Sequence, residues 1–268
     1  KMTNKHQFKL EVDLNVINHL GVGLYSSTPA ALTELVANAW DADANEVRIT
    51  IDKANGSISI EDDGHGMTAS AIRGRFLNVG YSRRKKSTNG NKSDSGLRRV
   101  MGRKGIGKLS MFALANLVKV TSQAPDNEVV GFVVDVPELK KSLETDKSLE
   151  LNEFEGEPFA KGQGTRIVLE KTLTGLQTTE SYLRVKLARR FSVLGNAYKF
   201  KVYLNDKEIT MADRGFYDHV QFLWTFDTET QKSTQELTKN LAAIAKSDTP
   251  GAPKEPCIKM LDSVIECE

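Results

Sequence analysis

The stretch ELVANAWDA, residues 34–42, repeats apolar residues at a helical period with polar residues between them. It follows Thr28 and Pro29, which suit the cap and the first turn of a helix. The spacing therefore predicts a helix that opens at Thr28 and buries a stripe made of Leu32, Leu35, Val36 and Ala39.

Two polar residues of this stretch, Glu34 and Asn38, lie four positions apart and so share one face of the helix. Asp41 or Ala42 follows on that face one further turn along. A carboxylate beside a carboxamide is costly to bury unless both groups have partners. Either the face binds a polar ligand or it is an ordinary polar face in solvent, and the helix alone leaves both interpretations open.

Strand-like runs around this helix predict a sheet. EVRITI, residues 46–51, alternates like a half-buried strand, residues 53–56 read as a hairpin turn, and SISIED, residues 57–62, returns as the partner strand. Residues 137–163 read as a polar, acidic excursion between strands. Further strands are expected in LVKVTS, EVVGFVVDV, TRIVLE and KFKVYLND.

Three more helices are expected from the apolar spacing. A short one runs from Thr68 to Leu77, and SYLRVKLARRFSVL, residues 181–194, forms a basic amphipathic helix. The third lies in GIGKLSMFALAN, residues 105–116, and its apolar side is expected to be Leu109, Phe112, Ala113 and Leu117.

The segment DDGHGM, residues 62–67, follows the second strand of the expected hairpin. Its glycines, Gly64 and Gly66, let the backbone turn sharply and let a flat ligand lie close. Asp62 at the strand end can accept a hydrogen bond from an exocyclic amine, and Met67 can cover an aromatic ring face. A plain Asp-Gly loop reads the same way, so this segment alone leaves its function open.

A second glycine-rich segment, GRKGIGK at residues 102–108, lies at the start of an expected helix. Free backbone N–H groups at a helix start bind phosphate, and Gly102, Gly105 and Gly107 allow close approach. The spacing nearly matches a P-loop, but Leu109 stands where that motif needs a Ser or Thr for magnesium. The preceding segment is also a polar loop rather than a buried strand, so we reject the P-loop interpretation.

A fourth short motif, GQGT at residues 162–165, enters the strand TRIVLE. Such a motif has little value alone, and its significance here is its position after the other three. In this order the four pieces resemble the GHKL ATPase superfamily, which includes gyrase B, MutL, the ninety-kilodalton heat-shock chaperone, microrchidia ATPases and sensor histidine kinases. The match covers roughly residues 14–170. The resemblance implies a Bergerat fold, an α/β two-layer sandwich of a mixed sheet with helices on one face.

The resemblance also implies roles for the motif residues, with ATP and Mg²⁺ as ligands. Asn38 would hold Mg²⁺, which bridges the phosphates, and Glu34 would orient and deprotonate the attacking water. Asp62 would bind the adenine amine, and Thr165 would support it through water. The remaining residues expected at the nucleotide are Gly64, Gly66 and Met67 around the base and Gly102, Lys104, Gly105, Ile106, Gly107 and Lys108 around the phosphates.

Glu34 indicates the branch of the superfamily. Histidine kinases transfer phosphate and lack a water-activating carboxylate at the position of Glu34. The Asp41-Ala42 pair after Asn38 also resembles the gyrase B, MutL, microrchidia and chaperone side. We therefore expect ATP hydrolysis that drives a conformational or dimerisation switch. The alternatives are a histidine-kinase-type phosphotransfer domain and a nucleotide-sensing module with negligible turnover. DNA and a protein client both stay open as partners.

Residues 79–104 have too few large apolar side chains to offset their ordering entropy, so we expect a mobile loop, the lid over ATP. Between Tyr81 and Lys108 the chain has ten Lys or Arg residues against the single acid Asp94. These charges read as a solvated loop, as a phosphate clamp or as a contact with DNA.

The change of pattern after Leu169 predicts two domains: residues 1–171 form the nucleotide-binding domain, and residues 172–268 form a second, transducer-like domain. In the hydrolysing branch a basic residue of that second domain often reaches the γ-phosphate. Candidates include Lys186, Arg189 and Arg190. The ending SVIECE lacks a closing signal, so we expect a longer natural chain.

The composition, with 39% hydrophobic and 27% charged residues, is that of a globular domain with a core of normal size. A net charge of +2 does not point to a dedicated nucleic-acid binder. No apolar run approaches a membrane span, and the polar start is not a signal peptide. Cys257 and Cys267 form no metal-binding spacing, so a reducing cytoplasm is the expected location.

Overall fold

A computed structural model describes much of the chain, including all of three motifs and part of GRKGIGK. Residue contacts divide the chain into two units, Lys1–Ile209 and Thr210–Glu268. The described residues are 8–12, 27–79, 92–93, 95–102, 107–144, 149–173, 180–194, 198–215, 222–225 and 257–260.

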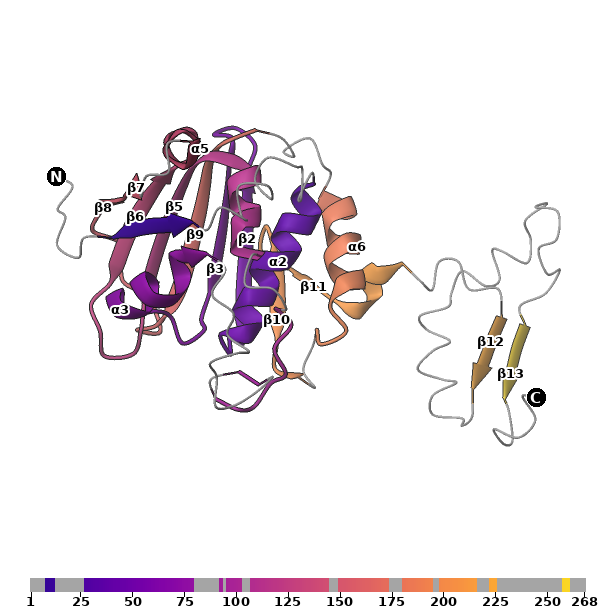
Figure 1. Ribbon diagram of the computed structural model, residues 1–268. Coiled ribbons are helices and arrows are strands. Elements are labelled where there is room, and N and C mark those ends of the chain that lie inside the picture. Colours follow the sequence, from indigo (N-terminus) through magenta and orange to yellow (C-terminus); the bar gives the residue numbers. More distant parts are fainter. Residues whose placement is uncertain are drawn as a thin grey trace. The chain divides into compact units, whose positions relative to one another are not determined.

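An eight-stranded mixed sheet forms the frame of the first unit (Figure 1). In spatial order its strands are β11 (Lys207–Ile209), β10 (Lys201–Leu204), β2 (Glu46–Asp52), β3 (Ser57–Asp62), β9 (Gly164–Thr172), β5 (Ala115–Gln123), β6 (Val130–Asp135) and β8 (Asn152–Glu153). All neighbouring strands run antiparallel except β10 and β2, which are parallel. The β2–β3 hairpin turns at residues 53–56, as predicted.

Helices α2 (Thr28–Asp41) and α6 (Glu180–Arg190) contact each other and lie side by side over one face of this sheet (Figure 1). The stripe predicted for α2 is buried throughout, from Leu32 to Ala39. Alternate side chains of the sheet, such as Val47 and Ile49 of β2, join the same core. The predicted two-layer α/β sandwich with a mixed sheet is confirmed.

A separate, smaller sheet has three strands in the order β4 (Asn78–Val79), β1 (Lys9–Val12) and β7 (Leu149–Glu150). It is attached to the core by Phe8, whose ring centroid lies 5.4 Å from that of Phe132 on β6. The short helix expected near residue 68 is present as α3 (Ala69–Ala71), which continues into a π-helical turn at Ile72–Phe76. Thr68 caps it, since its hydroxyl accepts a hydrogen bond from the backbone N–H of Ala71.

Two elements differ from the prediction. The helix expected at residues 105–116 is a 3₁₀ segment, η2 (Gly107–Ala113), and Leu117 belongs to β5 because its backbone pairs there with Asp135. Ala113, expected on the apolar side, is exposed. The acidic excursion contains helix α5 (Val136–Glu144), begun by the side chain of Asp135, which accepts the backbone N–H of Glu138 at 2.9 Å.

The first unit also extends beyond the expected boundary at residue 171. Strand β10 pairs with β2, β11 pairs with β10, and α6 packs against α2. These contacts cannot be broken without exposing buried side chains such as Leu183 and Leu187 of α6. The observed division therefore falls between Ile209 and Thr210 rather than after residue 171.

The described part of the second unit begins with a 3₁₀ turn, Met211–Arg214, which Thr210 and Asp213 close as a capping box. It also contains a parallel pair of strands, β12 (Phe222–Thr225) and β13 (Cys257–Met260). Its assignment as a transducer-like domain stays a prediction.

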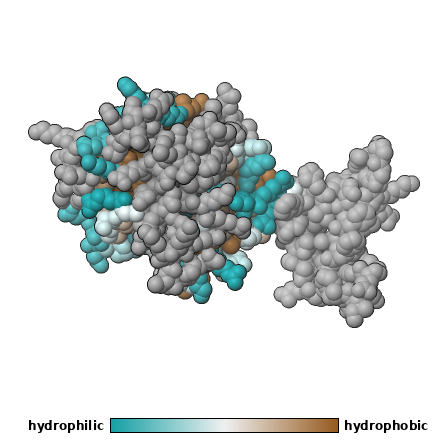
Figure 2. Space-filling model, in the orientation of Figure 1, coloured by the Kyte–Doolittle hydropathy of each residue, from teal (hydrophilic) through white to brown (hydrophobic). Residues whose placement is uncertain are grey.

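The described surface of the first unit is mainly hydrophilic in the view of Figure 2. Among the described residues the large apolar side chains that are exposed lie singly along the chain, at Leu97, Leu173, Tyr182, Tyr198 and Met211. In the described parts of the chain, every helix is too short or too polar to cross a bilayer.

Candidate functional site

Helix α2 presents the two polar residues from which the site was predicted. Its N-cap is Ser27 rather than the expected Thr28, and Pro29 lies in its first turn as expected. Glu34 is half-buried and Asn38 is exposed, so the face they share is open rather than closed by the core. An open carboxamide and a partly shielded carboxylate are available to a polar ligand on this face.

The C-terminal end of α2 is where two glycine-rich segments meet the helix. The backbone N–H of His65, in DDGHGM, donates to the carbonyl of Ala42 at 2.9 Å. The buried carboxylate of Asp41 accepts the backbone N–H groups of Met101 at 2.6 Å and Gly102 at 2.9 Å. The start of GRKGIGK is therefore held one turn beyond Asn38, by a residue that the sequence left without an assigned partner.

Asp62, Thr165 and Ser122 stand directly opposite one another on β3, β9 and β5. Opposite residues of antiparallel strands point to the same face, so the three side chains form one row, here called the acceptor row. The carboxylate of Asp62 accepts the backbone N–H of Gly64 at 2.9 Å. The hydroxyl groups of Ser122 and Thr165 lie 3.0 Å apart. Asp62 and Thr165 are neighbours across the β3–β9 pair, and their joint contact with a base stays a prediction.

Ser122 was missed by sequence reasoning. It is fully buried, and its hydroxyl accepts the backbone N–H of Met67 at 2.9 Å. One signal in the sequence could have indicated it. Ser122 lies two positions after Val120 in LVKVTS, so a polar residue ends the face that Val118 and Val120 turn to the core. A buried hydroxyl there needs partners, but only the pairing of three strands reveals which ones it has.

Burial raises the pKa of Asp62 to about 7, and the neighbouring carboxylates of Asp63 and Glu61 push this pKa in the same direction. The backbone N–H groups of Gly64 and Thr165 oppose the rise because they stabilise the ionised form. A carboxyl group poised near neutrality at the end of a strand is typical of a ligand site as well as of a strained ion network.

The glycines of DDGHGM are required by the protein itself. A Cβ on Gly64 would lie 2.7 Å from the carbonyl oxygen of Ala42, and one on Gly66, where φ is +60°, would lie 1.8 Å from that of Gln123. The loop is therefore wedged between the end of α2 and the end of β5. Its glycines permit these close approaches of backbone whether or not a flat ligand also lies against them.

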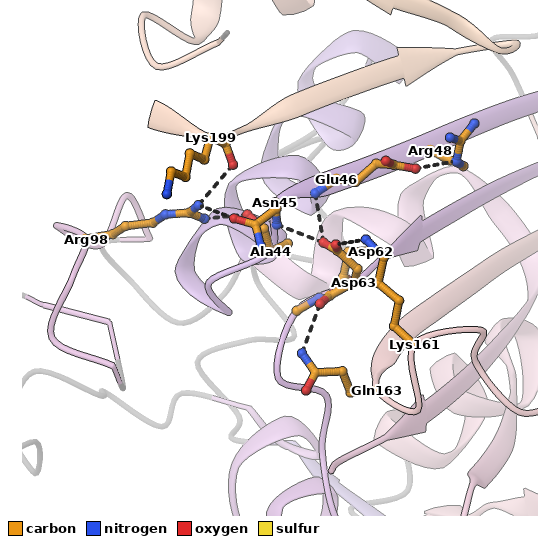
Figure 3. A network of polar contacts seen from close by, with 11 residues as sticks. Ala44, Asn45, Glu46, Arg48, Asp62, Asp63, Arg98, Lys161, Gln163 and Lys199 are labelled. Carbon is orange, nitrogen blue, oxygen red and sulfur yellow. Dashed lines mark hydrogen bonds and ion pairs between the residues drawn. The ribbon is translucent and has the colours of Figure 1, made fainter. Parts of the chain in front are cut away.

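Asp63 joins DDGHGM to GQGT and to the turn after α2 in the polar network of Figure 3. One carboxylate oxygen accepts the backbone N–H groups of Asn45 and Glu46, both at 2.7 Å. The other lies 2.6 Å from the ammonium of Lys161, and the carbonyl of Asp63 accepts the side-chain amide of Gln163 at 3.2 Å. The loop of DDGHGM is thereby attached both to the turn after α2 and to GQGT.

The described part of the expected lid is a folded turn rather than an extended loop. Lys92 and Arg99 form an antiparallel bridge, and the buried hydroxyl of Ser93 accepts the backbone N–H of Arg98. The indole N–H of Trp40 donates to the carbonyl of Arg99 at 2.9 Å. Residues 92–93 and 95–102 are thus held on the end of α2, and the rest of the segment 79–104, apart from Val79, lies outside the described residues.

Arg98 ties this turn to two further segments (Figure 3). Its guanidinium lies 4.4 Å from the ring centroid of Trp40 and donates to the carbonyl of Ala44. It also donates to the carbonyls of Tyr198 and Lys199, at 3.5 and 3.4 Å, just before β10. A planar fork of donors suits several carbonyl groups at once, which an ammonium cannot match.

The phosphate side of the predicted site is described only in part. Lys104, Gly105 and Ile106 lie outside the described residues, and Gly107 and Lys108 are described as backbone of η2. Their contacts with phosphate stay a prediction. On α6 the ammonium of Lys186 lies 5.1 Å from the ring centroid of Tyr182 on its own helix, so it has a local partner.

A protein family described as histidine kinase-, DNA gyrase B-, and HSP90-like ATPase matches residues 25–160. This range contains three of the four motifs, and GQGT follows it directly.

Curated relatives match between 46 and 87% of the chain. The "Putative type II restriction enzyme HgiDII" of Herpetosiphon aurantiacus is 37% identical over 233 residues, which are 87% of this chain and 37% of the relative. "Chaperone protein HtpG" of Shewanella sp. (strain ANA-3) is 32% identical over 200 residues, 62% of this chain and 30% of the relative. "Heat shock protein 90-6, mitochondrial" of Arabidopsis thaliana is 28% identical over 145 residues, 46% of this chain and 18% of the relative. The chain thus spans 18 to 37% of the length of these relatives.

Proposed function

The chain belongs to the histidine kinase-, DNA gyrase B-, and HSP90-like ATPases, and on that basis we propose that it binds ATP with Mg²⁺ and hydrolyses it to ADP and phosphate. One observation carries the proposal. Helix α2 bears Glu34 and Asn38. Its C-terminal end is hydrogen-bonded to both glycine-rich segments, through Ala42 and Asp41. Glu34 and Asn38, which suit phosphate chemistry, are thereby connected through α2 to the loop DDGHGM, which suits a purine base.

The base end of the proposed site is the acceptor row. The carboxylate of Asp62 and the hydroxyl of Thr165, on neighbouring strands, would receive the exocyclic amine of adenine, directly or through water. Met67, which is half-buried, would offer its thioether to the ring face. Gly64 and Gly66 shape the loop that carries these groups.

The phosphate end would use backbone N–H groups and an amide oxygen. The exposed carboxamide of Asn38 would supply an oxygen ligand of the kind Mg²⁺ accepts. Bound Mg²⁺ neutralises charge that develops on the phosphates during transfer. Gly102, the segment Lys104–Ile106, Gly107 and Lys108 would surround the phosphates, in the role that the family resemblance gives to them.

Glu34 would orient the attacking water and take its proton. It lies on the same helix face as Asn38, and its side chain is half-buried. General-base assistance of this kind contributes roughly 10²–10⁴-fold in rate. Glu34 is also the feature that favours hydrolysis over the alternative, transfer of phosphate to a histidine.

The test compares binding with turnover. Glu34→Gln should retain ATP affinity in calorimetry and lose phosphate release by roughly 10²-fold or more. Glu150→Gln on the small sheet, where the side chain is 72% exposed, is the matched control and should keep full turnover. Unchanged turnover in Glu34→Gln would remove Glu34 from the mechanism. A stable, acid-labile phosphoprotein formed from labelled ATP would favour histidine-kinase-type transfer, and tight binding without release a nucleotide-sensing module.

We further propose that ATP gates a conformational or dimerisation switch in a longer protein that acts on DNA. The 37% identity over 87% of this chain with a relative named as a restriction enzyme supports DNA over a protein client. The basic residues between Tyr81 and Lys108 supply charge for such a contact. Binding to duplex DNA should then weaken steeply with salt. Salt-independent binding, or none, would contradict DNA contact by this chain, and light scattering with a non-hydrolysable analogue tests dimerisation.

A further inference from the structure

The hydroxyl group of Ser122, at the end of β5, takes part in three hydrogen bonds. It is fully buried, with an exposed fraction of 0%. Its hydroxyl lies 2.9 Å from the carbonyl oxygen of Gly164, 3.0 Å from the hydroxyl of Thr165 and 2.9 Å from the backbone nitrogen of Met67. It therefore touches both GQGT and DDGHGM, the two motifs at the base end of the proposed site.

The direction of these hydrogen bonds follows from counting protons. A serine hydroxyl has one proton to donate and two lone pairs to accept with. A carbonyl oxygen can only accept, so the proton of Ser122 goes to Gly164. Met67 donates its backbone N–H to one lone pair of Ser122. In the contact between the two hydroxyl groups, Thr165 must then be the donor and Ser122 the acceptor.

This direction leaves Thr165 with lone pairs only. Its single proton is committed to Ser122, so any further partner of its hydroxyl has to be a donor. Asp62, its direct neighbour on β3, is also an acceptor when ionised, and one of its oxygens already receives the N–H of Gly64. When Asp62 is ionised, Asp62 and Thr165 together thus offer acceptors and no donor to whatever lies against them.

We propose that Ser122 is a positioning residue that selects the base, by fixing Thr165 as an acceptor beside Asp62. This inference rests on the proposed function. A purine with an amino group at position 6 can donate directly to this pair. A purine with a carbonyl at the same position would bring an acceptor against acceptors only. The carbonyl and its protein neighbours would then stay without hydrogen bonds, and this cost lets the site prefer the amino purine.

Without Ser122 the discrimination should relax. In Ser122→Ala the hydroxyl of Thr165 is free to rotate, and it can donate to a carbonyl as readily as it accepts from an amine. The ratio of affinities for ATP and inosine triphosphate should then fall about tenfold, as expected for one hydrogen bond of fixed direction. Ser122→Thr keeps a hydroxyl and should restore the ratio.

The experiment measures ATP and inosine triphosphate affinities by calorimetry in matched variants, at a pH above the pKa of about 7 of Asp62, where its carboxylate is ionised. Ser59→Ala, the same change on the other face of β3, is the control and should leave the ratio unchanged. Thr165→Val should lower the ratio by itself, and adding Ser122→Ala to it should lower the ratio no further, because Ser122 acts through Thr165. Thermal unfolding of each variant establishes that it is folded at the temperature of the measurement.

The outcomes separate this inference from the function on which it rests. If the wild type binds ATP in preference to inosine triphosphate and folded Ser122→Ala keeps the same ratio, the role of Ser122 is wrong while the proposed function stands. An additive loss of discrimination in the double variant overturns it as well. If the wild type binds neither nucleotide, the proposed function fails and this inference fails with it.

Discussion

The backbone N–H of Gly102 donates to the carboxylate of Asp41 at 2.9 Å, so the first glycine of GRKGIGK is bound to the helix that bears Asn38. The same carboxylate binds the N–H of Met101. Each oxygen of the carboxylate accepts one of these two adjacent backbone N–H groups. An asparagine side chain has only one acceptor oxygen and cannot bind both in this way. The contact fixes where the phosphate segment begins.

Gly102→Ala should displace this segment, because the added Cβ would lie 2.8 Å from a carboxylate oxygen of Asp41. Asp41→Asn should weaken the same contact by replacing one acceptor with a donor. We expect both changes to weaken ATP binding about tenfold, as for loss of one charge-assisted hydrogen bond, in calorimetry. Gly74→Ala is the matched control, since a Cβ there meets no atom within 4 Å. Wild-type affinity in both variants would separate this contact from nucleotide binding.

Arg98→Lys should destabilise the fold by about 1–2 kcal/mol, although the charge is kept. The ammonium cannot bind several carbonyl groups while stacking on Trp40, as the guanidinium does at 4.4 Å. Urea unfolding gives the change in free energy, and hydrogen exchange should show faster opening of residues 95–102. Arg99→Lys is the control, because Arg99 is exposed and its backbone carbonyl is the group bound by Trp40. Equal stability of the two variants would refute the special role of Arg98.

Asp62 should make both stability and nucleotide binding depend on pH. Its pKa in the folded protein is raised from 3.8 to about 7, so the folded state holds this proton more tightly than the unfolded state. Its contribution to stability is therefore fully present below the unfolded pKa and is lost as the pH rises through about 7. Asp62→Asn should flatten that slope in thermal unfolding, whereas Asp206→Asn, on a side chain that is 94% exposed, should leave it unchanged.

ATP affinity should change in the opposite sense, because the proposed amine contact needs the ionised carboxylate. Between about pH 6 and about pH 8 the affinity of the wild type is expected to rise, by up to tenfold per unit below the pKa. Asp62→Asn should bind weakly with no such rise. A pH-independent affinity in the wild type would argue against Asp62 as the acceptor of the base.

Asp63 should matter for stability through backbone donors rather than through its ion pair. Its carboxylate accepts two backbone N–H groups at 2.7 Å, which Asp63→Ala would leave without their acceptor, at a cost of about 2–3 kcal/mol. The partner ammonium of Lys161 is 62% exposed, so Lys161→Met should cost less than about 1 kcal/mol. Denaturant unfolding of both variants checks the order, and a larger loss in Lys161→Met would reverse the interpretation.

Local patterns predicted the elements whose contacts are close in sequence. The stripe of α2, the β2–β3 hairpin and the four motifs were all readable because period and turn residues are local properties. The 3₁₀ form of η2 and the helix α5 were missed. The end of η2 is set by the pairing of β5, which takes up Leu117. The residue that begins α5, Asp135, lies inside a run whose pattern predicted a strand.

What only the tertiary structure decided are the contacts between residues far apart in the chain. Sequence alone supplied Asp62, Glu34 and Asn38 as candidates by residue type and spacing, and Thr165 through the family resemblance. That Ser122 sets the direction of the hydrogen bond of Thr165 follows from the pairing of two strands 43 positions apart. That Arg98 reaches the carbonyl of Lys199, 101 positions away, follows from α6 and β10 completing the first unit. Periodicity carries information over a few residues, whereas a hydrogen bond between distant segments exists only once the sheet brings them together.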